Sequence, residues 1–222
     1  MTPIITIDGP SGTGKGTLAV RLAHHLGWHC LDSGALYRVL GLAAGRRAID
    51  LEDAAALAAL AAQLGVTFVD GRVLLDGEDL GDAIRTETAG MAASRVAAHP
   101  AVRAALLDWQ RRQARGPGLV ADGRDMGTVV FPQAPLKVFL DASAEERAAR
   151  RYKQLIGKGL SANLADLAVD IRERDTRDRN RPVAPLRPAA GALMVDSTAL
   201  SINDVFDLIL EEVRRVFPDQ VH

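Results

Sequence analysis

Cysteine is nearly absent from this sequence of 222 residues, which contains only Cys30. A lone thiol cannot form an internal disulfide or share a metal site with a second cysteine, so a reducing compartment is expected. A basic, apolar leader is also missing after Met1, which favours the cytoplasm over secretion. The longest uncharged stretch, 54–69, is shorter than the roughly 20 apolar residues that span a bilayer, so no membrane segment is expected.

An excess of charge is missing as well. The sequence has 27 basic and 28 acidic residues and a net charge of -1, which argues against a protein that coats nucleic acid. Its 48% apolar and 25% charged residues exclude wholesale disorder and fit one α/β domain with a modest insertion. We expect small-molecule partners and a monomer. The basic residues are 23 Arg and 4 Lys; a GC-rich genome would explain this bias, but it makes the position of Lys15 informative.

Short apolar runs alternate with helical patterns along the chain. Strands are predicted at 4–7, 119–123, 136–141 and 193–196. Helices are predicted at 15–25, from Asp32-Ser33 onward, at 50–64, on either side of 99–100, at 143–152, through the charge cluster 172–181, and at 201–217. This alternation predicts an α/β fold with a mainly parallel, doubly wound sheet. A hairpin or meander at about 66–80, with turns at Asp70-Gly71 and Asp76-Gly77, predicts an antiparallel insertion.

A glycine-rich segment between the first strand and the first helix indicates phosphate binding. The pattern is GxxxxGK, and the residues expected to hold a nucleotide are Gly9, Pro10, Ser11, Gly12, Thr13, Gly14, Lys15, Gly16 and Thr17. Glycines let successive backbone N–H groups converge on phosphate oxygens, and the helix N-terminus favours an anion. The lysine carries a mobile positive charge to the β- and γ-phosphates. The segment therefore predicts a P-loop.

The metal site is less complete in the sequence. The strict P-loop has Ser or Thr directly after the lysine to ligate Mg²⁺, but here Gly16 stands there and Thr17 follows. Asp122 ends an apolar strand, where a carboxylate could orient magnesium-bound water. An acid at a strand end is more often a helix cap or an ion-pair partner, so Thr17 and Asp122 are candidates for indirect metal contact only.

Two signatures of other P-loop proteins are absent, which narrows the function. There is no Asn-Lys-x-Asp, the guanine-reading segment of GTPases, and no Leu-Ser-Gly-Gly-Gln of ABC ATPases. A small-molecule kinase remains. Three arginine-bearing segments fit an acceptor site: 32–38, 122–132, and Arg174-x-x-x-Asp178-x-x-Arg181, whose spacing predicts one helix face. A charge run such as 172–181 can also be a solvated surface.

These segments closely resemble bacterial cytidylate kinases, which are nucleoside monophosphate kinases with a P-loop. The resemblance covers GPSGTGKGT, DSGALYR, ADGRDMGTVVFP, FLDASAEERAARR, ERDTRDRNRPVAPL and DST at 196–198. It implies a five-stranded, mainly parallel sheet flanked by helices, with a small antiparallel β insertion and a lid. It also implies ATP-dependent phosphorylation of CMP and dCMP. The implied regions are a core at about 1–32, 119–148 and 165–222, an acceptor-binding region at about 33–118, and a lid at about 149–164.

The resemblance also implies roles for individual residues. Ser33, Arg38, Arg124 and Arg181 would surround the acceptor phosphate, Ser94, Arg103 and Asp125 would read cytosine, and Arg174 and Asp178 would contact the sugar. Tyr37 is a further candidate for substrate binding. Lys15, Arg124, Arg147 and Arg151 would act in catalysis, the last two beside Arg150 at the start of the lid. Asp125 could instead merely neutralise Arg124.

The expected mechanism needs ATP and Mg²⁺ but no general base, because the acceptor is a phosphate oxygen whose second pKa is about 6. No histidine lies in any of the motifs. Two other functions remain open: a P-loop kinase that acts on shikimate or gluconate, and a non-catalytic nucleotide-binding module.

Overall fold

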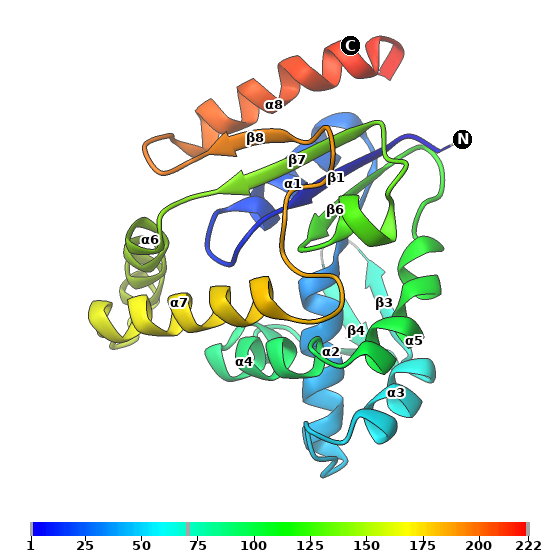
Figure 1. Ribbon diagram of the computed structural model, residues 1–222, viewed down its shortest axis with the longest axis vertical. Helices are drawn as coiled ribbons and strands as arrows, with labels where there is room; N and C mark the ends of the chain where they lie inside the picture. Colours follow the sequence, from blue (N-terminus) through cyan, green and yellow to red (C-terminus); the bar gives the residue numbers. More distant parts are fainter. Residues whose placement is uncertain (1, 70–71, 221–222) are drawn as a thin grey trace. The chain divides into compact units, whose positions relative to one another are not determined.

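The computed structural model describes residues 2–69 and 72–220, which form two compact units (Figure 1). One unit contains the residues up to Cys30 and those from Ala114 onward, and the other contains Leu31–Gln113. The predicted turn at Asp70-Gly71 lies outside the described residues.

The larger sheet has five strands within the described chain, in the order β2-β6-β1-β7-β8. Strand β1 pairs in parallel with β6 and with β7, and β7 pairs in parallel with β8. The elements of this part of the chain are β1 (Ile4–Asp8), α1 (Lys15–Leu26), β2 (His29–Asp32), β6 (Leu119–Gly123), η2 (Met126–Val130), β7 (Leu136–Asp141), α6 (Ala144–Gly157), α7 (Leu164–Asn180), β8 (Leu193–Asp196), α8 (Ile202–Val216) and η3 (Pro218–Gln220).

The core of this unit explains why its strands read as continuous apolar runs. Strand residues such as Ile5, Ile7 and Val138 are buried together with Leu22 of α1 and Ile209 of α8. Central strands of a parallel sheet are covered on both faces, so they need no alternation of polar and apolar residues. The four predicted strands are confirmed within one residue. Strand β2 was not predicted.

Two helices of this unit are longer than predicted. Helix α6 continues past Tyr152 to Gly157, because the residues between them tolerate a helix and the left-handed glycine that ends it, with φ of 74°, is Gly159. The helix through the charge cluster, α7, already begins at Leu164 and ends at Asn180. Arg181 lies just beyond it in an extended conformation, since the following Pro182 disfavours a helical residue before it. The prediction that Arg181 shares a helix face with Arg174 and Asp178 is therefore wrong.

The second unit packs helices against a small antiparallel sheet, β3-β4-β5. Its elements are α2 (Ser33–Arg46), α3 (Ala54–Ala62), β3 (Val66–Val69), β4 (Arg72–Leu75), β5 (Glu78–Asp79), η1 (Ala83–Arg85), α4 (Glu87–Val96) and α5 (Pro100–Arg111). The antiparallel insertion is confirmed. Helix α3 is shorter than the predicted 50–64, because Asp53 caps it by accepting a hydrogen bond from Ala56 N at 3.0 Å.

Helices α2 and α4 approach each other closely, and a glycine allows it. A Cβ at Gly41 would lie 2.9 Å from Ala92 Cβ, which is too close for two carbon atoms. The buried residues of this unit, among them Leu36, Leu40 and Val96, form a core of their own. Across the described residues, no helix is both long and apolar enough to cross a bilayer.

Candidate active site

The glycine-rich loop lies between the end of β1 and the start of α1, as predicted. Gly14 precedes the helix in the left-handed conformation, with φ of 91°, and a Cβ at Gly9 would lie only 2.0 Å from Leu140 O. Both positions therefore require glycine. Lys15 is buried, and its ammonium donates a hydrogen bond to Pro10 O at 3.0 Å, across the loop. The same carbonyl accepts a bond from Thr13 Oγ1 at 3.2 Å.

Asp122 lies beside this loop at the carboxyl end of β6. Its Oδ1 is 4.0 Å from Lys15 Nζ, and its Oδ2 is 3.1 Å from the position that a Cβ at Gly16 would occupy. A serine or threonine at position 16 would crowd this carboxylate. Thr17 is exposed on the first turn of α1. Among the described residues no three His, Cys, Asp or Glu side chains gather as metal ligands. The donor set near the loop thus fits an ion held mainly by phosphates and water.

Two arginines of α6 hold the glycine-rich loop from outside. Arg147 is buried, and its guanidinium donates to Ser11 O at 3.0 Å, to Ala142 O at 2.9 Å and to both oxygens of Asp175 at 3.1 and 2.5 Å. Arg150 donates to Thr13 O at 3.2 Å and to Ser197 O at 2.5 Å. Arg151 is half-buried and donates to Gln154 Oε1 at 3.3 Å. Arg147 and Arg150 thus connect α6, the loop and the segment after β8.

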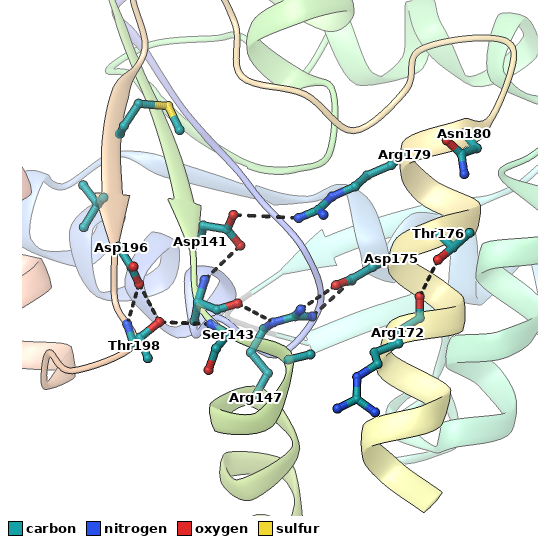
Figure 2. Close-up of a pocket in the computed structure, with 14 residues that line it drawn as sticks. Asp141, Ser143, Arg147, Arg172, Asp175, Thr176, Arg179, Asn180, Asp196 and Thr198 are labelled. Atoms are coloured by element: carbon teal, nitrogen blue, oxygen red, sulfur yellow. Dashed lines mark hydrogen bonds and ion pairs between the residues drawn. The ribbon is translucent and has the colours of Figure 1, made fainter.

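A cavity of about 890 Å³ opens beside Arg147, where β7 and β8 end (Figure 2). Its polar lining comes from the ends of β7 and β8, from the segments that follow them, and from α6 and α7: Asp141, Ser143, Arg147, Arg172, Asp175, Thr176, Arg179, Asn180, Asp196 and Thr198. Figure 2 shows Arg147 and Asp175 paired across one side and Asp196 bonded to Thr198 on the other. The carboxyl ends of parallel strands are where doubly wound folds bind ligands.

Four of the predicted acceptor residues form a cluster of alternating charge in the same unit. Arg124 Nε donates to Asp178 Oδ2 at 3.1 Å, and Arg181 Nη2 lies 3.8 Å from Asp125 Oδ1. Burial acts to raise the pKa of Asp178, but the positive charges of Arg124, Arg174 and Arg181 outweigh it and lower this pKa. Asp178 is therefore ionised at neutral pH and holds Arg124 in place.

The predicted residues of the second unit form a separate group. The guanidinium of Arg103 lies 5.5 Å from the centre of the Tyr37 ring, within the range of a cation–π contact. Arg38 donates to Ile84 O at 2.8 Å and to Thr86 O at 3.2 Å. Ser33 is buried in the first turn of α2, and Ser94 is buried in α4.

Asp8 is a buried acid of this region that the sequence reasoning missed. It ends β1 directly before Gly9, and its carboxylate accepts hydrogen bonds from Met126 N and Gly127 N, both at 2.8 Å. Burial raises its pKa to about 6, although these two bonds lower it. The available signal was an acid at the end of a short β-branched strand, Ile4–Asp8.

A lysine-bearing loop after the first strand of a parallel sheet, beside a cluster of arginines and carboxylates at a neighbouring strand end, defines a P-loop kinase. Two solved structures share the fold. An uncharacterized protein from Eubacterium ventriosum ATCC 27560 is 11% identical with a TM-score of 0.53, covering 97% of this chain and 99% of that one. A sugar kinase from Janibacter sp. HTCC2649 is 16% identical with a TM-score of 0.50, covering 100% and 99%.

The sequence narrows the class further. The family model described as Cytidylate kinase matches residues 5–215, and the chain belongs to the cytidylate kinase family. Among its relatives, a cytidylate kinase of Aeromonas hydrophila is 62% identical over 95% of this chain and 93% of that one. Another, of Edwardsiella ictaluri, is 59% identical over 97% of each.

Proposed function

We propose that this protein transfers the γ-phosphoryl group of ATP to CMP and dCMP, giving ADP and CDP or dCDP. The observation that carries the proposal is the presence, in one unit, of the Lys15 loop and of the half-buried Arg124 with the buried Asp125, Asp178 and Arg181. A nucleotide sensor would need the loop alone. Membership of the cytidylate kinase family supports the choice of acceptor.

The two halves of the donor nucleotide bind at different places. Its phosphates bind the amides of the glycine-rich loop and Lys15. Its nucleoside half occupies the cavity beside Arg147, whose volume of about 890 Å³ is in the usual range for ligand sites. Three carboxylates line this cavity, those of Asp141, Asp175 and Asp196. Arg147, Arg172 and Arg179 balance their charge, and the carboxylates can accept hydrogen bonds from an amine and from sugar hydroxyls.

Magnesium accompanies the ATP phosphates in this proposal. Thr17 and Asp122, which lies near both Lys15 and Gly16, would hold the ion through bound water. The ion supplies positive charge against the negative charge that develops on the phosphate oxygens.

We propose a role for each of the predicted acceptor residues. Ser33, Arg38, Arg124 and Arg181 hold the acceptor phosphate, and Arg174 and Asp178 contact the sugar. Asp125, Ser94 and Arg103 read cytosine, with Tyr37 packed on Arg103. A carboxylate suits the cytosine amine, as it does when Asp or Glu reads cytosine in DNA, and it repels the O4 atom of uracil.

The transfer itself needs positioning rather than proton abstraction. An oxygen of the acceptor phosphate attacks the γ-phosphorus, the bond to the β-γ bridging oxygen breaks, and ADP leaves with that electron pair. Lys15, Arg124 and Arg151 stabilise the charge on the transferring group. We propose the lid at about 149–164, the end of α6 and the connection to α7, as the segment that excludes water. Arg147 keeps the loop in place during the reaction.

A coupled assay of ADP release tests this function. ATP and Mg²⁺ are supplied with CMP, dCMP, UMP, AMP, shikimate or gluconate in separate reactions. Turnover with CMP and dCMP well above the others is expected. Turnover with shikimate or gluconate alone, or ATP binding with no turnover, would refute the proposal. We further propose that the protein is a cytoplasmic monomer. Light scattering after size-exclusion chromatography tests the oligomeric state.

A further inference from the structure

Asp8 has a structural role that the mechanism above does not use. It is 2% exposed, and it stands directly before the glycine-rich loop. Its two carboxylate oxygens bind two successive amides, Met126 N and Gly127 N, each at 2.8 Å. These amides open η2, a single π-helical turn, and N–H groups at the start of a helix have no acceptor within that helix.

The amides that Asp8 binds follow directly on two proposed acceptor residues. Arg124 and Asp125 stand between the end of β6 and η2, and Asp8 is paired with Gly123 in the sheet register. We name residues 123–128 the acceptor loop. The loop is anchored at its start by the sheet and at its end by Asp8, so the backbone directions of Arg124 and Asp125 are fixed from both sides.

The loop also lies close against β1. A Cβ at Gly127 would be 2.8 Å from Thr6 Oγ1, 3.2 Å from Ala189 Cβ and 3.4 Å from Asp8 Oδ2. Any side chain at position 127 would push the loop away from the strand. The contact between Asp8 and the two amides thus depends on this glycine.

Only a carboxylate supplies what the two amides need. An asparagine would present one acceptor and one amine, and the amine would face an N–H donor. A buried ionised group opposes folding unless its bonds offset the lost hydration, and Asp125, a second acid, also acts to raise the pKa of Asp8. The burial of the Asp8 carboxylate therefore opposes folding, while the same carboxylate caps the first amides of η2.

We infer that Asp8 is a positioning residue of the acceptor site: by holding the Met126 and Gly127 amides it sets the direction of Arg124 and Asp125, and so controls affinity for the acceptor nucleotide and the choice of base. This inference rests on the proposed function. It connects the strand that begins the donor loop with the loop that bears the acceptor-binding side chains.

The test compares Asp8→Asn with Thr6→Val, a matched control on the same strand that touches the same loop but takes away no acceptor of the amides. Asp8→Asn is expected to raise KM for CMP by about ten- to a hundredfold, the scale of a small misplacement of binding groups. KM for ATP should stay within about twofold, and the ratio of kcat/KM for CMP over UMP should fall. Thr6→Val should leave all three near wild type.

Gly127→Ala provides a second route, because it moves the amides while Asp8 remains. It should give the same kinetic pattern, and hydrogen exchange should become faster at Met126 and Gly127 in both variants. An unchanged KM for CMP in Asp8→Asn, or an equal rise for CMP and ATP with a matching effect in Thr6→Val, would overturn the inference. If Asp8→Asn does not fold, a wild-type KM for CMP in Gly127→Ala overturns it. Wild-type enzyme without CMP-dependent ADP release would instead refute the proposed function.

Discussion

Replacing Arg147 by methionine tests whether this buried side chain supports the glycine-rich loop. Methionine keeps most of the apolar stem but leaves three acceptors without their donor: Ser11 O, Ala142 O and the Asp175 carboxylate. Removing one partner of a buried ion pair costs about 3–5 kcal/mol. The lower half of that range is expected, because Asp175 borders the cavity, where water can reach its oxygens.

The assay is urea unfolding followed by the fluorescence of Trp28, which belongs to the same unit and packs edge-on against Phe217. A Trp109→Phe background removes the signal of the other unit. Arg147→Met should lower the free energy of unfolding by about 3–4 kcal/mol. The control is Arg172→Met, because Arg172 is exposed and pairs with the exposed Glu145 on the same two helices. It should leave the unfolding midpoint almost unchanged.

A double variant separates the ion pair with Asp175 from the bond to the loop. In Arg147→Met with Asp175→Leu, apolar side chains of similar volume replace the pair, and such exchanges are often neutral. The part of the lost stability that comes from the unpaired Asp175 should return, but kcat should stay low, because Ser11 O still lacks its donor. An unchanged midpoint in Arg147→Met would refute the supporting role. A double variant that regains the wild-type kcat would refute the support of the loop through Ser11 O.

Four further outcomes are expected. Lys15→Ala should lower kcat by more than tenfold, since one cation at a transferring phosphoryl group can be worth about 10³–10⁵, while circular dichroism stays that of the wild type. Asp125→Asn should lower the CMP/UMP ratio of kcat/KM by at least about tenfold, the worth of a discriminating polar contact; an equal loss for both bases would contradict base reading. Asp178→Ala should raise KM for CMP, and for dCMP by the same factor if it faces the 3′-hydroxyl or by less if it faces the 2′-hydroxyl; near-wild-type constants for both would exclude a sugar contact. Asp8 has a pKa of about 6 in the folded protein against 3.8 for a free carboxyl. Protonation of Asp8 therefore stabilises the fold below pH 3.8, and this stabilisation is lost as the pH rises through 6. In urea unfolding, the free energy of unfolding of Asp8→Asn should rise relative to wild type by up to about 3 kcal/mol between pH 4 and 7.

The strands of the larger sheet could be predicted because their signal is local. Ile4–Asp8 and Leu136–Asp141 are apolar runs bounded by turn residues, and the structure has them as β1 and β7. Strand β2 carries no such signal, since Leu31 is the one fully buried residue of its four. Its pairing with β6 depends on residues about 90 positions away, which a local pattern does not contain.

The candidate site likewise has parts that a local sequence pattern predicts and parts that depend on distant residues. The glycine-rich loop is a contiguous pattern, so its residues and the helix after it could be predicted. The partners of Asp8 are 118 and 119 positions away, and no residue near Asp8 in the sequence indicates which amides it binds. Arg181 shows a different limit: a spacing of seven predicts a shared helix face only if the helix lasts that long, and Pro182 ends it first.

The bonds from α6 to the glycine-rich loop also determine which way the loop's amides point. A peptide group is planar and trans, so its N–H points opposite to its C=O. Arg147 fixes the carbonyl of Ser11, and Arg150 fixes that of Thr13. The N–H groups of Gly12 and Gly14, which share those peptide planes, are thereby turned away from α6. Two cations that need not touch the nucleotide thus orient the dipoles that would receive its phosphates, and any movement of α6 would turn those dipoles with it.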